Sequence, residues 1–206
     1  MSAAKNIPTI GVVILGAGAS SRMGRPKLLL PWRNTTVIGA ILRQWHELGA
    51  RQIAVVLRHG DAPLAAELDR LDHPRADRIE NPKPELGMFS SVVCAANWPG
   101  WKREIASWAV VLGDQPHLRM DTLRALLEFH AANADAICQP QFDSHGRHPV
   151  ILPRTAFELL KQTPAESLRD FLKQISCPSV KCRMADSGLA LDMDTPEDYK
   201  RLKVSI

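Results

Sequence analysis

A loop near the start of the chain combines small, flexible residues with fixed positive charge. Residues 16–27 read GAGASSRMGRPK. Glycines let the main chain approach a ligand closely and aim N–H groups at it, and serine hydroxyls add donors. Arg22 and Lys27 bring cations to the same loop, a combination that fits a triphosphate group. The alternative is a glycine turn that carries ordinary surface cations.

Two familiar phosphate-binding motifs do not match this loop. A P-loop requires a lysine directly after its last glycine, whereas Lys27 is separated from Gly24 and is followed by leucine. A dinucleotide-binding loop requires a third small residue and an acid at the end of the second strand. Here Ser21 takes the third position, and the second apolar run ends in Arg58 and His59. A nicotinamide or flavin cofactor is therefore disfavoured, and a dinucleotide-dependent oxidoreductase is kept only as an alternative.

Two aspartates follow apolar runs further along the chain. Asp114 comes after the run 107–112, and Asp194 comes after the run 189–193. Because the carboxyl ends of parallel strands meet at one edge of a sheet, both side chains can reach the same crevice. Taken separately, Asp114 could be a turn residue, and Asp194 could be a helix cap that competes with Thr195. Together with the cationic loop at the same edge, they indicate a functional site.

Strand and helix patterns alternate along the sequence that must position these residues. Apolar runs rich in β-branched residues predict strands, and apolar residues at helical spacing predict helices. The expected strands are 9–15, 52–57, 77–80, 107–112, 134–139, 148–152, 179–184 and 189–193. The expected helices are 36–48, 62–71, 88–96, 121–132, one within 164–176, and one after Thr195. Asp121 and Thr195 are the expected N-caps of the helices that they precede.

This order predicts an α/β fold. We expect residues 1–206 to form a single three-layer, Rossmann-like domain with a mostly parallel sheet and helices on both faces. Ligands of such sheets bind beyond the carboxyl ends of the strands, where the loop and both aspartates are expected.

Composition and charge narrow the classes of function. The net charge of +4 is mildly basic, and no run of like charges or nucleic-acid-binding module accompanies it. No apolar run is long enough to span a membrane, and the first ten residues lack the apolar segment of a secretion signal. The four cysteines show no metal-ligand spacing and are expected to be reduced thiols. We therefore expect a cytoplasmic protein that binds neither nucleic acid nor membrane.

Five blocks, in order, resemble the nucleotidyltransferases related to the molybdenum-cofactor cytidylyltransferase, the MobA-like NTP transferases. The blocks are LGAGASSRMGRPK (15–27), NP followed by GMFSSV (81–92), GDQP (113–116), HPV (148–150) and DMDTPED (192–198). Two departures stand out. Gly16 takes the place of an alanine that is usual in the family. Arg147 takes the place of the glycine before His148, and Gly146 is displaced by one position.

The resemblance implies a nucleotide-diphospho-sugar-transferase-like fold and a specific reaction. A phosphate oxygen of an acceptor attacks the α-phosphorus of a nucleoside triphosphate, and pyrophosphate leaves. CTP and molybdopterin are the favoured substrates, with Mg²⁺ as cofactor. GTP or another phosphorylated acceptor is an alternative, and so is a non-catalytic carrier that delivers nucleotide or molybdenum cofactor to a molybdoenzyme.

The resemblance also assigns roles to individual residues. Asp114 and Asp194 would hold the metal, and Arg22 and Lys27 would act with Asp114 in catalysis by stabilising the phosphates and the leaving pyrophosphate. His148 would contact the acceptor. The expected nucleotide-binding residues are Leu15, Gly16, Ala17, Gly18, Ser20, Asn81, Gly87, Ser90 and Ser91.

Overall fold

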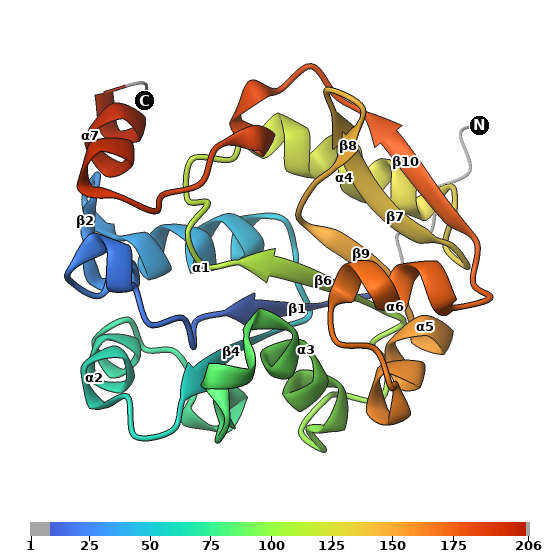
Figure 1. Ribbon diagram of the computed structural model, residues 1–206, viewed down its shortest axis with the longest axis horizontal. Helices are drawn as coiled ribbons and strands as arrows, with labels where there is room; N and C mark the ends of the chain where they lie inside the picture. Colours follow the sequence, from blue (N-terminus) through green and yellow to red (C-terminus); the bar gives the residue numbers. More distant parts are fainter. Residues whose placement is uncertain (1–8, 205–206) are drawn as a thin grey trace.

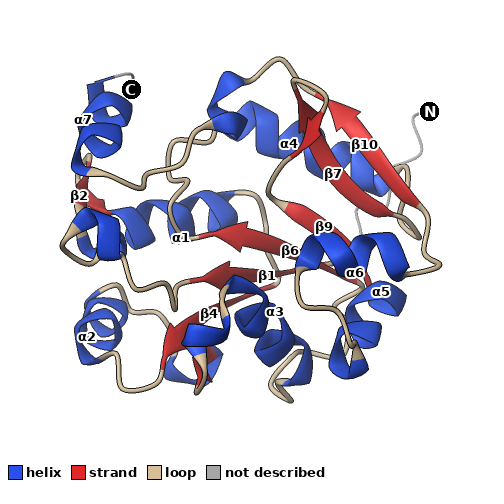
Figure 2. Cartoon of the chain, viewed as in Figure 1, coloured by secondary structure: helices blue, strands red, loops and turns tan. Residues whose placement is uncertain are grey.

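A central sheet organises the computed structural model, which describes residues 9–204. Its strands are β1 (Ile10–Leu15), β4 (Gln52–Arg58), β5 (Arg78–Asn81), β6 (Ser107–Leu112), β7 (Ile137–Phe142), β8 (His145–Gly146), β9 (Val150–Pro153) and β10 (Ser179–Arg183). The strand order is β10-β7-β9-β6-β1-β4-β5, with β8 beside β7. Strands β6, β1, β4 and β5 are mutually parallel, and β9 runs antiparallel to both β6 and β7 (Figure 2). A separate hairpin pairs β2 (Pro31–Trp32) with β3 (Thr35–Thr36).

Helices cover both faces of the sheet (Figure 1). They are α1 (Val37–Glu47), α2 (Ala62–Arg70), α3 (Met88–Asn97), α4 (Met120–Ala131), α5 (Arg154–Leu159), α6 (Leu168–Gln174) and α7 (Pro196–Val204). Buried side chains of α1, α2, α4 and α7 pack in one apolar cluster, and those of α3, α5 and α6 pack in another. The predicted three-layer α/β fold with a mostly parallel sheet is confirmed.

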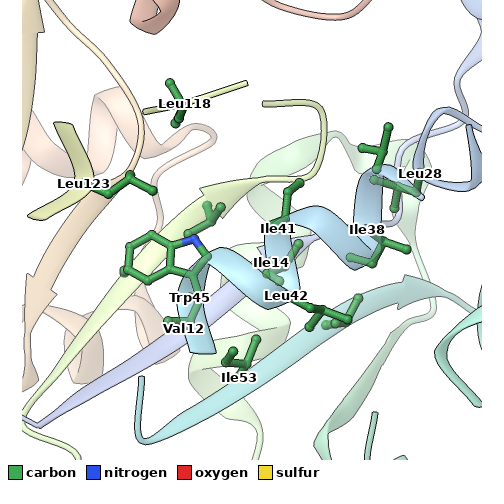
Figure 3. Packing of buried hydrophobic residues seen from close by; sticks show 14 of the residues in the cluster. Val12, Ile14, Leu28, Ile38, Ile41, Leu42, Trp45, Ile53, Leu118 and Leu123 are labelled. Atoms are coloured by element: carbon green, nitrogen blue, oxygen red, sulfur yellow. The ribbon is translucent and has the colours of Figure 1, made fainter. Parts of the chain in front are cut away.

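The period of two along β1 explains why the sheet is buried on both faces. Val12 and Ile14 point to the α1 side, where they lie beneath Ile41 and Trp45 (Figure 3), whereas Val13 belongs to the α3 side. All three strand residues are fully buried. Burying a side chain of this size stabilises the fold by roughly 1.5–3 kcal/mol relative to leaving it exposed. The continuous apolar run therefore encodes a central strand with helices on both sides.

Short 3₁₀ turns connect many of these elements. They cover Ser21–Met23, Lys27–Leu29, Arg75–Asp77, Pro84–Leu86, Leu160–Gln162 and Ser187–Ala190. The last of them replaces the strand expected over 189–193, so that prediction was wrong. Side-chain bonds of Asp186 hold this segment: its carboxylate accepts hydrogen bonds from the Gly188 amide (2.9 Å) and from the hydroxyl of Thr122 on distant α4 (2.5 Å). Such side-chain bonds favour a turn over a strand.

Two further expectations differ in detail. Helix α4 begins at Met120, so Asp121 lies in its first turn and is not its N-cap. Helix α5 and the β2–β3 hairpin had no expected counterpart, because each is too short to show a periodic pattern. The expected absence of a secretion signal concerns residues that lie mostly outside the described range. Within that range, no helix combines the length and apolar character that crossing a bilayer requires.

Candidate active site

A cavity of about 330 Å³ opens at the carboxyl ends of β1 and β6. Several residues expected at the site line it: Leu15, Gly16, Ala17, Gly18, Ser20, Lys27, Gly87, Ser91 and Asp114. Ala19, Leu28, Pro84, Met88, Leu112 and Gly113 complete the lining. The loop after the first strand, the turn after β6 and the start of α3 therefore meet around one hollow, as expected for a ligand site at the edge of an α/β sheet.

A hydrogen bond and two buried side chains fix the loop after β1. Ser20 adopts the left-handed conformation (φ 50°), and its hydroxyl oxygen accepts a hydrogen bond of 3.1 Å from the main-chain N–H of Lys27. Met23 and Leu28 are buried and anchor the loop to the core. The backbone of Lys27 is thus fixed at the wall of the cavity.

Two glycines allow the strand ends to lie unusually close together. A Cβ atom at Gly113 would lie 2.6 Å from the main-chain oxygen of Leu15, and one at Gly16 would lie 2.9 Å from that of Val56. The Gly16 N–H also donates a 2.9 Å hydrogen bond to the same Val56 oxygen. Contacts this short leave no room for a side chain without a backbone shift. Glycine at position 113 therefore places Asp114 directly beside the loop.

Lys27 lies between two carboxylates that come from distant parts of the chain. Its Nζ atom is 2.8 Å from Asp114 Oδ2 and 2.9 Å from Asp194 Oδ1. Arg22 contacts the other oxygen of Asp194 at 2.7 Å. The Lys27 side chain is only 16% exposed, whereas that of Arg22 is 70% exposed. The structure thus brings together the cations and acids expected at the catalytic centre.

The two carboxylates hold Lys27 in its charged form. Burial alone would lower the pKa of Lys27, but hydrogen bonds and charge attraction from Asp114 and then from Asp194 outweigh that effect, so the net pKa is raised. An ammonium group with a raised pKa keeps its proton at every pH near neutrality. Lys27 is therefore a fixed positive charge and not a proton donor or acceptor.

Asp194 is not the N-cap of α7, because another residue takes that role. The Thr195 hydroxyl oxygen accepts a 3.2 Å hydrogen bond from the Asp198 N–H, and the Asp198 carboxylate accepts one of 3.0 Å from the Thr195 N–H. This reciprocal pairing is the expected N-terminal cap at Thr195. Asp194 itself lies on the irregular segment after the 3₁₀ turn Ser187–Ala190, not after a strand.

The segment that carries Asp194 is held against the turn after β6. The Gln115 side-chain amide donates hydrogen bonds to the main-chain oxygen of Leu191 (3.3 Å) and to Asp192 Oδ1 (3.1 Å). His117 Nε2 lies 3.0 Å from the Gly188 carbonyl oxygen and donates to it. These bonds join the two acid-bearing segments, so the position of Asp194 depends on residues next to Asp114.

Sequence reasoning passed over Gln115 and Asp192 as site residues. Burial raises the pKa of Asp192, and the negative charges of Asp114 and then Asp194 raise it further. Asp192 thus lies within the negative field of the other two aspartates. Both residues belong to blocks that carry the resemblance, GDQP and DMDTPED. Their closeness in sequence to Asp114 and Asp194 was the signal that could have identified them.

Asn81 and Ser90 lie beside the cavity and do not line it. Asn81 is fully buried, and its amide donates to the hydroxyl oxygens of Ser90 (2.8 Å) and Ser91 (3.0 Å) while its oxygen accepts from the Lys83 N–H (2.9 Å). The Ser90 hydroxyl donates to the Gly87 carbonyl oxygen at 2.7 Å. Asn81 thus orients the first turn of α3, which presents Ser91 and Gly87 to the cavity.

His148 lies apart from the Lys27 cluster and lines a second cavity, which shares Met88 with the first. Its Nδ1 atom is 3.2 Å from the Val110 carbonyl oxygen, to which it donates. Burial lowers the pKa of the His148 ring. The ring is therefore neutral near pH 7, and Nε2 remains as an acceptor.

The oxygen ligands that Asp114 and Asp194 offer fit part of a magnesium site. Mg²⁺ takes oxygen ligands and commonly uses one or two carboxylates together with phosphate oxygens and water. Asp114 and Asp194 meet at one ammonium group, and Asp114 Oδ1 is buried without a hydrogen-bond partner. Among residues 9–204, no group of three or more His, Cys, Asp or Glu residues is arranged to hold a metal ion. Phosphate and water would have to supply the remaining ligands.

Comparison with known proteins identifies the class to which this chain belongs. The model of the MobA-like NTP transferase domain matches residues 12–180. This range contains the loop, the Asp114 turn and the start of α3, and the chain is a member of that family.

Individual relatives carry different activities. The chain is 27% identical to the molybdenum cofactor cytidylyltransferase of Escherichia coli (strain K12) over 92% of this chain and 93% of that protein. It is also 27% identical to nicotine blue oxidoreductase of Paenarthrobacter nicotinovorans over 96% of this chain and 98% of that protein. The bifunctional protein GlmU of Clavibacter sepedonicus is 33% identical, but the chain spans only 25% of its length.

Solved structures confirm the fold. Rv0371c of Mycobacterium tuberculosis H37Rv superposes with a TM-score of 0.75 at 27% identity, over 97% of this chain and 99% of that one. A complex of Rv0371C with manganese superposes with a TM-score of 0.71 at 25% identity, over 96% of this chain and 100% of that one. Manganese is thus bound by a protein of the same fold.

Proposed function

We propose that this protein is a Mg²⁺-dependent cytidylyltransferase that transfers CMP from CTP to the phosphate of molybdopterin and releases pyrophosphate. The observation that carries the proposal is the convergence of Lys27, Asp114 and Asp194 beside the cavity after β1. The similarity to the E. coli molybdenum cofactor cytidylyltransferase over nearly the whole chain supports the choice of substrates.

The charged residues have complementary roles in this proposal. Asp114 and Asp194 hold Mg²⁺, which when bound neutralises charge on the phosphate oxygens. Lys27 and Arg22 bind the triphosphate and stabilise the negative charge that develops on the leaving pyrophosphate. An acceptor phosphate is already ionised near neutral pH, so no side chain has to remove a proton. The work of the chain is to align the reacting groups and to balance charge.

The remaining residues position the two substrates. Main-chain groups of residues 15–18 contact the nucleobase, and Ser20 fixes the loop that carries Lys27. Asn81 and Ser90 support the nucleotide from behind, by holding Gly87 and Ser91 at the wall of the cavity. His148 contacts the acceptor from the second cavity. Residues 1–206 act as one cytoplasmic domain, and a recipient molybdoenzyme is the expected partner for the product.

Pyrophosphate release tests this proposal. The protein is incubated with Mg²⁺ and molybdenum-loaded molybdopterin, together with CTP, GTP, ATP or UTP in separate reactions. We expect release with CTP above all others. A preference for GTP would move the proposal to the guanylyl alternative. Nucleotide binding without release of pyrophosphate in any reaction would favour the non-catalytic carrier.

The similarity to nicotine blue oxidoreductase supports a second candidate, a dinucleotide-dependent oxidoreductase. Against it stand the serine at position 21 and the lack of an acid after the second strand. Titration with NADPH and NADH, followed by fluorescence, distinguishes the candidates. Saturable binding of either dinucleotide at micromolar concentration, without binding of CTP, would favour the oxidoreductase.

A further inference from the structure

The second cavity, of about 640 Å³, lies over the β7–β8 hairpin, α6 and β10. Four cationic side chains line it: Arg147, Arg169, Lys173 and Lys181. None of the described residues that line it is an aspartate or a glutamate. A cavity with this lining attracts anions and repels cations.

The cations of this cavity are not neutralised by neighbouring acids. Lys173 has one distant carboxylate partner, Asp170 Oδ1 at 3.8 Å. For Arg147, Arg169 and Lys181, the described part of the chain provides no ion-pair partner. Elsewhere on the surface, arginines pair with acids at short distance, as Arg51 does with Glu104 at 2.7 Å. The positive charge of the cavity is therefore available to a ligand.

Arg147 is the least exposed of these cations. Its main-chain N–H donates a 2.8 Å hydrogen bond to the Pro140 carbonyl oxygen, directly after the pairing of Gly146 with Gln141. Its Nε atom is buried and has no hydrogen-bond partner. A guanidinium group that is half-buried with an unused donor is suited to bind a carboxylate or phosphate. This is also the residue that takes the place of the family's usual glycine.

The two cavities are neighbours. Met88, at the start of α3, lines both of them. His148 follows Arg147 directly and is bonded to Val110 of β6, the strand that leads to Asp114. A ligand with one end at the Asp114 cavity can therefore extend past Met88 to Arg147.

We propose that Arg147, with Lys181 and Arg169, binds a second anionic group of the acceptor, at the end away from the reacting phosphate. The inference rests on the proposed function, because it assumes that the acceptor phosphate lies near Asp114. It specifies the acceptor further: a molecule that is anionic at both ends is favoured over a phosphate ester whose other end is neutral.

The binding of two matched phosphate esters tests the inference and requires no catalytic turnover. Binding of glucose 1,6-bisphosphate and of glucose 1-phosphate is measured by titration calorimetry, with Mg²⁺ and the non-reacting analogue α,β-methylene-CTP present. We expect the wild-type protein to bind the bisphosphate at least about tenfold more tightly, the gain that one charge-assisted hydrogen bond provides. Arg147→Ala should remove most of this preference, Lys181→Ala should reduce it, and Arg147→Lys should retain part of it.

Arg103→Ala is the matched control, because Arg103 is an exposed arginine outside both cavities and its loss changes the net charge equally. It should leave the preference unchanged. Equal preference in Arg147→Ala, Lys181→Ala and the wild type would overturn the inference, and so would the absence of any preference in the wild type. If Arg147→Ala does not fold, Lys181→Ala and Arg147→Lys carry the test.

The binding test of the anion site can succeed or fail independently of the pyrophosphate-release test of the proposed function. Both esters are measured again without the nucleotide analogue. An Arg147-dependent preference for the bisphosphate in a protein that releases no pyrophosphate would support the anion site and contradict the transferase. Pyrophosphate release with an Arg147-independent preference would do the reverse.

Discussion

The two cavities hold positive charge in opposite ways. At the first, Lys27 and Arg22 are already paired with Asp114 and Asp194. At the second, Arg147 and Lys181 face the cavity without acidic partners. A site that holds both signs of charge can accept a cation together with an anion, such as Mg²⁺ with a triphosphate. A site that holds only cations suits an anion alone.

Loss of a carboxylate at the first cavity should have the largest effect. Asp114→Asn removes a proposed metal ligand and one partner of Lys27, and turnover should fall at least about a thousandfold. The rate of pyrophosphate release measures it. Asp121→Asn is the control, because that side chain is 78% exposed on α4, and its rate should match the wild type. A normal rate for Asp114→Asn would refute the metal assignment.

Loss of a cation should have different effects at the two cavities. Lys27→Met should lower kcat about 100-fold, as removal of one electrostatic stabiliser does. It also leaves Asp114 without its cationic partner and Asp194 with Arg22 alone, so the melting temperature should fall, and Mg²⁺ should restore part of it by supplying positive charge. Lys181→Met, at the second cavity, should leave the melting temperature unchanged. Equal losses of stability in both variants would remove the distinction between paired and unpaired cations.

The close contact behind Asp114 should appear as a loss of stability. Gly113→Ala places a Cβ atom 2.6 Å from the Leu15 carbonyl oxygen, so the backbone must shift. The free energy of unfolding should fall by about 1–3 kcal/mol, as for other overpacked sites. Gly18→Ala provides the comparison, because nothing lies within 4 Å of a Cβ atom there, and should change stability by less than about 0.5 kcal/mol. Urea denaturation measures both, and equal effects would argue against the contact.

A buried histidine outside both cavities should give the smallest effect. His130 is fully buried, and burial lowers its pKa below the ordinary value of 6.5. Below that pH the unfolded chain gains a proton that the folded chain does not, so stability is complete above about pH 6.5 and decreases as the pH falls. The slope from this group is at most about 1.4 kcal/mol per pH unit. In urea denaturation at pH 7.5, 6.5 and 5.5, His130→Gln should reduce the slope, whereas exposed His145→Gln should not.

The fold was predictable because its central strands are buried on both faces. Such strands read as uninterrupted apolar runs, and β1, β4 and β6 lie where those runs predicted them. The segment 189–193 was misassigned because its geometry depends on Asp186, which lies outside the apolar run, and on Thr122, which is distant in the chain. Long-range side-chain bonds leave no local pattern in the sequence.

The sequence predicted which segments of the chain meet at the site. The position of glycine 16 and the acids after the expected strands indicated one crevice, and the structure places Lys27, Asp114 and Asp194 in contact there. The sequence could not show that Asn81 is buried behind the cavity, since a buried amide and a ligand-binding amide look alike. Nor could it show that Arg147 lacks an acidic partner, because that depends on three-dimensional neighbours.

Helix α7 is hydrogen-bonded to the segment that follows the Lys27 loop. The Tyr199 hydroxyl of α7 donates a 2.5 Å hydrogen bond to the Pro31 carbonyl oxygen, just after the loop that carries Lys27. All strands of the sheet precede residue 186. Asp194 and α7 follow the sheet in the chain, and Tyr199 and Leu202 of α7 are buried in the same apolar cluster as Met23 and Leu28 of the loop. A chain cut before Asp194 would therefore lose part of its apolar core together with one carboxylate of the charge cluster.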